Sequence, residues 1–390
     1  MTRTALRAAR LFDGVTTHAD PLVIVEDGRI TEVRTGPAPA DADLVDLGTA
    51  TLLPGLIDTH VHLGFDAGPD PVAALASRDD DAVLEAMAQA AAAQLRAGVT
   101  TVRDLGDRDY LALRLRESTA GLPTIVAAGP PITSPGGHCH FLGGVADRGV
   151  RDAVREHAER GVDVIKVMAS GGGMTPESDV NSPQFTPDDL AALVDEAHRH
   201  GLPVTAHAHA LGAIVDGVAA GVDGLEHCTF IDGERVNAPA DVVAAIVRRR
   251  IAVGATVGLA PVDPAEFRPP PFLAKILPEL MANLARLIRE GAVVVAGTDA
   301  GIGPIKPHGV LPHGLAHLAQ LGMHPAEALT AGTSTAAQVC GLGDRKGRVR
   351  PGYDAHLLAV DGDPLTDIGA LLRPVAVFVA GRPVVTAARS

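Results

Sequence analysis

The chain has 390 residues, of which 46% are hydrophobic and 21% are charged, so it can bury a large core and does not have the composition of a disordered protein. Its formal net charge is −14 and it has no basic cluster, which argues against nucleic acid or an anionic membrane as a partner. It has no uninterrupted apolar run of about 18 residues and no signal-peptide core near its first residues, so we expect a cytoplasmic protein. The three cysteines, Cys139, Cys228 and Cys340, have no short spacing and are expected to be reduced.

The two ends of the chain predict short strands. Apolar runs at 5–11 and 22–25 stop at Asp13-Gly14 and Asp27-Gly28, and the second pair is typical of a two-residue hairpin turn. A Pro/Ala/Asp segment at 38–43 is expected to be a linker. Apolar strands return after residue 341, so we expect the two termini to pair as a small β-sandwich domain made of residues 1–55 and 342–390.

Residues 56–341 alternate between strand, loop and helix. Helical runs end at glycine before a β-branched strand at five places: Gly98, Gly161, Gly201, Gly221 and Gly291. Eight apolar strands are predicted at 56–62, 99–105, 122–130, 162–170, 202–209, 222–230, 251–259 and 292–299. Eight strands that alternate with helices indicate an α/β fold, a (β/α)8 TIM barrel.

Polar residues interrupt several of these strands, beginning with His60 and His62 on the first. Residues two apart on a strand share a face, so both imidazoles leave on the same side. A single His-x-His pair is weak evidence for a metal site in a chain with 16 histidines. Whether His60 and His62 form part of a metal site depends on the polar residues of the other strands.

The fourth strand holds one lysine, Lys166, among apolar neighbours. A parallel strand covered on both faces offers this side chain no water, so we expect a buried amine with a lowered pKa that is free to react. The alternative is a structural ion pair with a barrel carboxylate such as Asp299.

Three later strands also end in polar residues: His207 and His209 on the fifth, His227 on the sixth and Asp299 on the eighth. Barrel enzymes carry their chemistry at this end of the strands. Imidazole and carboxylate are ligands for zinc and similar divalent metals. The combined set is too large for one tetrahedral ion, so it predicts two divalent ions, expected to be zinc.

On these residues the chain resembles the amidohydrolase superfamily over nearly its whole length. The resemblance implies the metal ligands His60, His62, Lys166, His207, His227 and Asp299. It also implies that Lys166 is carboxylated by carbon dioxide and, with a hydroxide, bridges the two ions. The segment 347–357 resembles a sequence motif that the family has in its flanking β-sandwich domain, except that His356 stands where the family usually has aspartate.

The run Ile-Lys-Val-Met-Ala-Ser-Gly-Gly-Gly at 165–173 resembles the branch of imidazolonepropionase-related enzymes and Xaa-Pro or Xaa-Arg dipeptidases. This resemblance implies hydrolysis of a C–N amide bond in a dipeptide or N-acyl amino acid. It implies that Asp299 moves a proton from the nucleophile to the departing amine, and that His140 is a donor that faces the substrate. An incidental loop histidine is the alternative for His140.

Other functions remain open at this stage. The same metals could serve a lactonase, a phosphotriesterase or a cyclic-amide hydrolase, and a metal-free scaffold is a further alternative. We expect a small-molecule substrate and a homo-oligomer. The sequence does not assign roles to His138, His209, His308 or His313, and it predicts that His157 lies on a helix surface or at a helix end.

Overall fold

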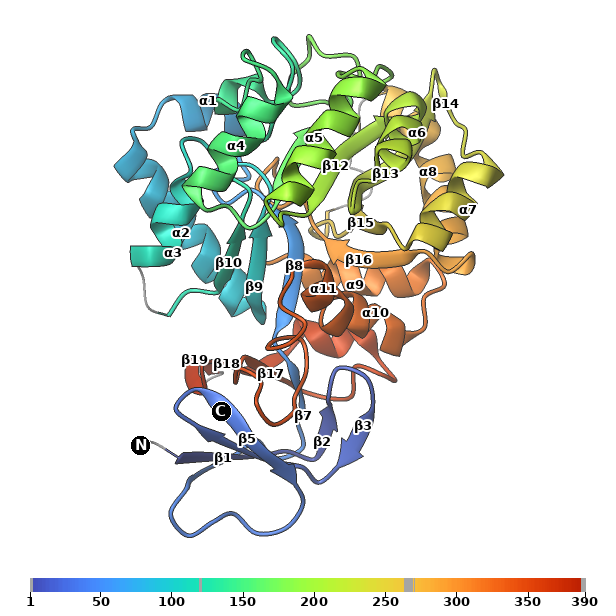
Figure 1. The fold of residues 1–390 in the computed structure, drawn as a ribbon. Coiled ribbons are helices and arrows are strands. Elements are labelled where there is room, and N and C mark those ends of the chain that lie inside the picture. The colour runs from blue at the N-terminus through green and yellow to red at the C-terminus, as the bar shows by residue number, and fades with distance from the viewer. Residues whose placement is uncertain (1–2, 119–120, 263–268, 270, 387–390) are drawn as a thin grey trace.

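The structure is a computed structural model that describes residues 3–118, 121–262, 269 and 271–386. Short strands from both ends of the chain lie at one end of the molecule, and parallel strands flanked by helices form the rest (Figure 1). Within the described residues, no helix combines the length and the apolar character that crossing a membrane requires.

Two sheets contain the terminal strands. The first has the order β5-β4-β1-β6 and consists of β1 (Arg3–Arg7), β4 (Leu22–Glu26), β5 (Arg29–Arg34) and β6 (Asp43–Asp46). The second has the order β19-β18-β17-β7-β2-β3 and consists of β2 (Arg10–Phe12), β3 (Thr17–Ala19), β7 (Thr51–Pro54), β17 (Leu357–Val360), β18 (Pro374–Val379) and β19 (Arg382–Thr386). One apolar cluster joins Leu6 and Val23 of the first sheet to Leu52 and Phe378 of the second. The predicted pairing of the two termini is therefore present.

The strand expected at 5–11 is divided in two. β1 pairs with β4 in the first sheet, whereas β2 pairs with β7 in the second, so the chain changes sheets at Ala8 and Ala9. The predicted hairpin is confirmed, because Glu26 pairs with Arg29 across a turn in which Asp27 has φ 48° and Gly28 has φ 82°. Both values belong to the left-handed region that such turns require.

An apolar strand lies at each of the eight positions expected in the central region. They are β8 (Leu56–Val61), β9 (Val99–Asp104), β10 (Thr124–Ala127), β11 (Ile165–Met168), β12 (Val204–Ala210), β13 (Gly224–Asp232), β15 (Ala252–Thr256) and β16 (Val293–Gly297). They pair in parallel in the orders β10-β9-β8 and β11-β12-β13-β15-β16, and the short β14 (Arg235–Val236) is antiparallel to β13. The molecule is thus an α/β fold with parallel sheets.

Hydrogen bonds connect the outer strands of the two parallel sheets. The carbonyl of His60 accepts from the backbone N–H groups of Thr298 and Asp299 at 3.2 and 2.8 Å, next to β16. On the other side, Ile132, which follows β10, forms a parallel bridge with Val167 of β11. These contacts bring the ends of β8 and β16 together and place the segment after β10 beside β11.

Helices lie along the outside of the strands (Figure 1). They are α1 (Pro71–Ala76), α2 (Asp80–Arg96), α3 (Leu111–Ser118), α4 (Val150–Arg160), α5 (Pro187–Arg199), α6 (Leu211–Ala220), α7 (Ala240–Arg249), α8 (Pro271–Arg289), α9 (Leu311–Gln320), α10 (Pro325–Ala331) and α11 (Ser334–Val339), with 3-10 turns η1 (His140–Leu142) and η2 (Ile368–Leu372). The five junction glycines have φ between 72° and 86°, as a left-handed helix stop requires. The side chain of Thr186 caps α5 by accepting from the N–H of Asp189.

Candidate metal centre

The six side chains expected to bind metal lie at one end of the parallel strands. His60 is in β8 and His62 follows it, while Asp299 comes two residues after β16. Asp299 Oδ1 lies 3.5 Å from Nε2 of His60 and 3.3 Å from Nε2 of His62. Lys166 Nζ is 3.4 Å from the same nitrogen of His60. These four residues, separated by up to 239 positions in the sequence, converge on one point.

A second group of imidazoles lies beside the first. The ring centroid of His207 is 4.6 Å from that of His227 and 4.6 Å from that of His209. His227 also joins the first group, because its ligand atom and those of His60 and Asp299 all lie within 4.8 Å of one another. His207, His209 and His227 satisfy the same limit. His227 therefore stands between two potential ion positions.

Hydrogen bonds on the far side of three rings determine which nitrogen faces these positions. His60 Nδ1 lies 2.9 Å from Glu226 Oε2, His62 Nδ1 lies 3.0 Å from the carbonyl of Gly106, and His207 Nε2 lies 3.2 Å from the carbonyl of Gly171. These oxygens accept hydrogen bonds, so each of the three nitrogens carries a proton. When such a ring is neutral, its other nitrogen keeps a lone pair, which is the form that binds a metal.

A buried ion pair between Glu226 and Arg103 contacts the ring of His60 on the side that faces away from Asp299. Glu226 lies 2.9 Å from Nη2 of Arg103, and its Oε1 also accepts from the hydroxyl of Thr205 at 2.6 Å. Burial alone raises the pKa of Glu226, but the charges of Arg103 and His60 outweigh it and lower that pKa. The pair holds the ring of His60 in place. Sequence reasoning missed it, although a charged residue inside each of two apolar strands was the available signal.

Burial keeps most of these imidazoles neutral. It lowers the pKa of His60 to about 4, and it lowers those of His207 and His227 well below the usual value. The pKa of His62 is raised instead, because the hydrogen bond and charge of Asp299 outweigh the effect of burial. Asp299 has a pKa well below its ordinary value because the attraction of His60 and His62 exceeds the cost of burial. Apart from His62, the group therefore offers neutral imidazoles, and it offers an ionised carboxylate, a donor set that fits divalent metal ions.

Lys166 is buried without a counterion. Its side chain is only 1% exposed, yet no carboxylate of the described residues lies within 4.0 Å of its amine. The structural ion pair with Asp299 that the sequence left open is thus not formed within that distance. Burial lowers the pKa of Lys166, which favours the neutral, nucleophilic amine.

The backbone is unusual where two of these residues leave their strands. His227 has φ 66° and Asp299 has φ 59°, values that side chains other than glycine rarely adopt. The N–H of Asp299 donates to the carbonyl of His60 at 2.8 Å, which helps to hold this conformation. Such conformations persist where surrounding contacts enforce them, and they gather at functional sites.

The loop after β10 carries two more histidines. His138 is 4% exposed and its ring centroid lies 4.7 Å from that of His207, so it belongs to the cluster. His140 is exposed, and its Nδ1 donates to the carbonyl of Gly137 at 3.0 Å. The ring of His140 contacts Phe141, which contacts Phe65 beside His62. The predicted substrate donor therefore lies at the rim of the site, while its unassigned neighbour lies inside it.

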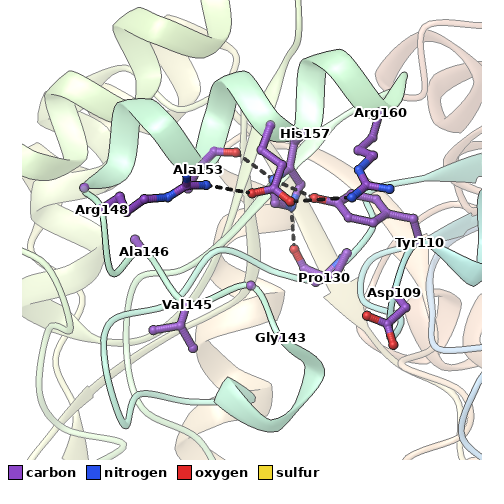
Figure 2. A pocket seen from close by; sticks show the side chains of 13 residues that line it. Asp109, Tyr110, Pro130, Gly143, Val145, Ala146, Arg148, Ala153, His157 and Arg160 are labelled. Carbon is purple, nitrogen blue, oxygen red and sulfur yellow. Dashed lines mark hydrogen bonds and ion pairs between the residues drawn. The ribbon is translucent and has the colours of Figure 1, made fainter.

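His308 and His157 make structural contacts. His308 donates from Nε2 to the carbonyl of Phe65 at 2.9 Å. His157 lies in the last turn of α4, so the expectation of a helix-end residue is met, but it is not at the surface: it is 3% exposed, and its Nε2 lies 2.7 Å from the carbonyl of Pro130. His157 faces a pocket of about 200 Å³ between α4 and the loop that precedes it (Figure 2). Arg148, Glu156 and Arg160 also line this pocket, which contains none of the clustered histidines.

Comparisons of this chain with a family model and with known proteins agree on one family. A model of the amidohydrolase family matches residues 51–384. Ochratoxinase from Aspergillus niger is 29% identical over 373 residues, which cover 84% of this chain and 73% of the relative. Imidazolonepropionase from Salinispora tropica is 27% identical over 379 residues, which cover 88% of this chain and 86% of the relative.

A solved structure extends the likeness to the whole fold. The crystal structure of a Xaa-Pro dipeptidase with bound methionine has a TM-score of 0.85 and 25% identity, covering 98% of this chain and 99% of that one. The resemblance drawn from the sequence, including its narrower branch, is confirmed. The chain belongs to the amidohydrolase family and is a hydrolase of that family.

Proposed function

We propose that this protein is a binuclear metal-dependent amidohydrolase that hydrolyses a C–N amide bond in a dipeptide or an N-acyl amino acid. The observation that carries the proposal is the convergence of buried imidazoles on an ionised Asp299, with Oδ1 within 3.5 Å of Nε2 of both His60 and His62. A scaffold without metal has no use for this costly burial of polar groups.

His60, His62 and Asp299 would hold one divalent ion, and His207 and His227 would hold the other. Zinc is the metal that this combination of imidazole and carboxylate suits best. Bound ions of this kind lower the pKa of water and polarise a carbonyl group. The remaining steps depend on the side chains of the chain itself.

Lys166 is proposed to carry a carbamate. Its neutral amine attacks carbon dioxide, one N–C bond forms, one C–O double bond becomes a single bond to a negatively charged oxygen, and the nitrogen releases a proton. The product is a carboxylate at a buried position where no counterion lies within 4.0 Å of the amine among the described residues. This modification would give both ions a shared oxygen ligand.

Asp299 is proposed to move the proton during hydrolysis. Its low pKa keeps the carboxylate ionised and able to accept a proton from the attacking water. It then donates that proton to the nitrogen that leaves when the C–N bond breaks. Glu226 acts as a positioning residue, because its contact with Nδ1 keeps His60 in the required tautomer.

The substrate class is supported by the relatives. One similar structure is a Xaa-Pro dipeptidase with methionine bound, and another is a prolidase in complex with N-methylphosphonate-L-proline, at 27% identity and a TM-score of 0.84. At the rim, His140 beside Phe141 offers a polar and an apolar contact for the part of the substrate that projects from the site. We propose that, when substrate binds, the ring of His140 turns from the carbonyl of Gly137 and donates its N–H to a carbonyl or carboxylate of the substrate.

We further propose that the eight parallel strands close into a (β/α)8 barrel. The bonds from Thr298 and Asp299 to His60 and the bridge between Ile132 and Val167 support closure at both sides. In this arrangement residues 56–341 are the barrel domain, and residues 1–55 and 342–390 are the β-sandwich domain.

A substrate panel on zinc-reconstituted protein tests the function. We expect dipeptides and N-acyl amino acids to be hydrolysed with kcat/KM at least about 10⁴ M⁻¹s⁻¹ for the best substrate, within the usual range for enzymes. Metal-free protein should be inactive and should recover on adding zinc. Preferred hydrolysis of lactones, aryl phosphates or cyclic amides would replace the proposed substrate, and inactivity toward every class with no bound metal would reject the proposal.

A further inference from the structure

The fifth parallel strand carries a second His-x-His pair, of which the family resemblance uses only His207. His207 and His209 are two residues apart on β12, so both side chains leave the strand on the same face. The register between β12 and β13 shifts next to His209: Ala208 pairs with His227 but Ala210 pairs with Ile231, so the extra residues lie on β13. The backbone N–H of His209 donates to Ser170 Oγ at 2.9 Å, which holds this part of β12 against the loop after β11. His209 therefore faces the cluster together with His207.

The geometry of the rings shows close contact. His209 lies 4.4 Å from His227 between ring centroids with the planes 24° apart, and 4.6 Å from His207 with the planes 85° apart. One ligand atom from each of these three rings lies within 4.8 Å of the others. Two nitrogens on one tetrahedral zinc ion are about 3.4 Å apart. Binding of the three atoms to a common ion therefore requires the ring of His209 to turn out of its stacked arrangement with the ring of His227, so that both lone pairs point to one position.

Thr229 determines the tautomer of His209. The hydroxyl of Thr229 donates its single hydrogen to the backbone carbonyl of His209 at 3.2 Å. The same oxygen lies 3.0 Å from Nδ1 of His209, so it accepts a hydrogen bond there and Nδ1 carries the proton. Nε2 of His209 is left with a lone pair. A nitrogen in this state binds a metal but donates no hydrogen bond to a substrate carbonyl or carboxylate.

We propose that His209 Nε2 is a third imidazole ligand to the ion held by His207 and His227, so that this position is a three-histidine site for a divalent cation such as zinc. The proposal rests on the metal-dependent function above and deepens it. Three imidazoles with an open fourth position are one of the ligand sets of catalytic zinc. This position would then keep an ion without the carbamate of Lys166.

Zinc titration of the whole, metal-free protein tests the proposal without using activity. Wild type is expected to bind two ions per chain. In His209→Ala one of the two affinities should fall by at least about 10-fold, since even the loss of an outer contact to a metal ligand costs 10-fold to 100-fold. The other affinity should not change. His200→Ala, at an exposed position at the end of α5, is the matched control and should bind zinc as wild type does.

Two results would overturn the proposal. The first is a His209→Ala protein that binds both ions with the affinities of wild type, which would leave the proposed function intact. The second is a wild-type protein that binds no ion, which would reject the proposed function as well. The two failures are therefore distinguishable.

A second variant covers the case in which His209→Ala does not fold. Thr229→Val removes the oxygen that fixes the tautomer but leaves the ring of His209 in place. It should weaken one zinc affinity by about 10-fold, with the far-ultraviolet circular dichroism of wild type. Unchanged zinc affinity in a folded Thr229→Val protein would contradict the proposed role of the tautomer and overturn the assignment.

Discussion

Two buried lysines show how the candidate metal centre differs from the rest of the interior. Lys346, in the segment that leads to β17, is 3% exposed and lies 3.2 Å from Asp354 Oδ2 and 3.2 Å from His356 Nδ1. Lys166 is 1% exposed, and among the described residues only His60 Nε2 is within hydrogen-bond distance of its amine, at 3.4 Å. The first lysine has a counterion and the second does not.

From this difference we expect a structural role for Lys346 and propose a reactive one for Lys166. A buried charge is stable when it is paired, and the ion pair of Lys346 meets that need within the protein itself. A buried amine without a counterion lies in its neutral form, which is a nucleophile for carbon dioxide. None of the described residues places a carboxylate within 4.0 Å of the Lys166 amine. Carboxylation of the amine itself would place a carboxylate there.

The largest effect is expected from Lys166→Ala. Loss of the shared ligand should remove at least one ion per chain and lower kcat/KM by more than the roughly 100-fold typical of losing an outer-shell partner. Metal analysis and kinetics on the same preparation measure both quantities. Short carboxylic acids should restore part of the activity, because they can occupy the position of the carbamate. Full activity without added acid would show that the two lysines do not differ in this way.

Asp299→Asn is expected to have the next largest effect. The amide keeps an oxygen toward His60 and His62 but cannot accept and return a proton. Turnover should fall by about 10²-fold or more while much of the metal is retained, as for other lost proton carriers. Asp354→Asn, which alters the carboxylate beside the other lysine, is the control and should leave kcat unchanged. An unaltered rate in Asp299→Asn would assign the proton to another group.

Lys346→Met should affect stability alone. It removes one partner of Asp354, which keeps a bond to Arg345 Nη2 at 2.7 Å, so we expect a loss of about 1–3 kcal/mol in the free energy of unfolding. Chemical denaturation measures this loss. Zinc content per folded chain should equal that of wild type. A loss of metal in this variant would remove the distinction between the two regions.

The smallest effect concerns the pH dependence of stability. Burial, together with the charge of Lys346, lowers the pKa of His356 from 6.5 to about 4. The unfolded chain therefore binds a proton at this residue at a higher pH than the folded chain does, and the stability from neutral His356 is lost as pH falls from about 6.5 to about 4. His356→Asn should flatten the decline in unfolding free energy over this window. An unchanged slope would mean that His356 titrates normally in the folded protein.

The strands and the main polar residues were accessible from the sequence because their signals are local. Apolar runs, five of them directly after a glycine that ends a helix, predicted the eight strands, and polar residues within these strands or at their ends predicted His60, Lys166 and Asp299. Side-chain contacts between different strands could not be predicted from the sequence. The bond from Glu226 to His60 joins residues 166 positions apart, and the side chain of Arg103 reaches it from a third strand.

Local irregularity also escaped prediction. The division of the run 5–11 into β1 and β2 depends on which sheet each half meets, and apolar composition does not encode that choice. The irregularity of β13 next to His209 has the same character: the His-x-His pattern is visible in the sequence, whereas the extra residues of β13 after His227 are seen only in the pairing of β12 with β13. Both features are properties of packing rather than of sequence pattern.

The most direct test of the central claim is a carbon-13 NMR spectrum of the zinc-loaded protein equilibrated with ¹³C-labelled bicarbonate. We predict one slowly exchanging carbamate signal that is present in wild type and in Lys346→Met and is absent in Lys166→Ala. A wild-type spectrum without a carbamate signal, or a signal that persists in Lys166→Ala, would contradict the claim that the unpaired buried lysine completes the metal centre.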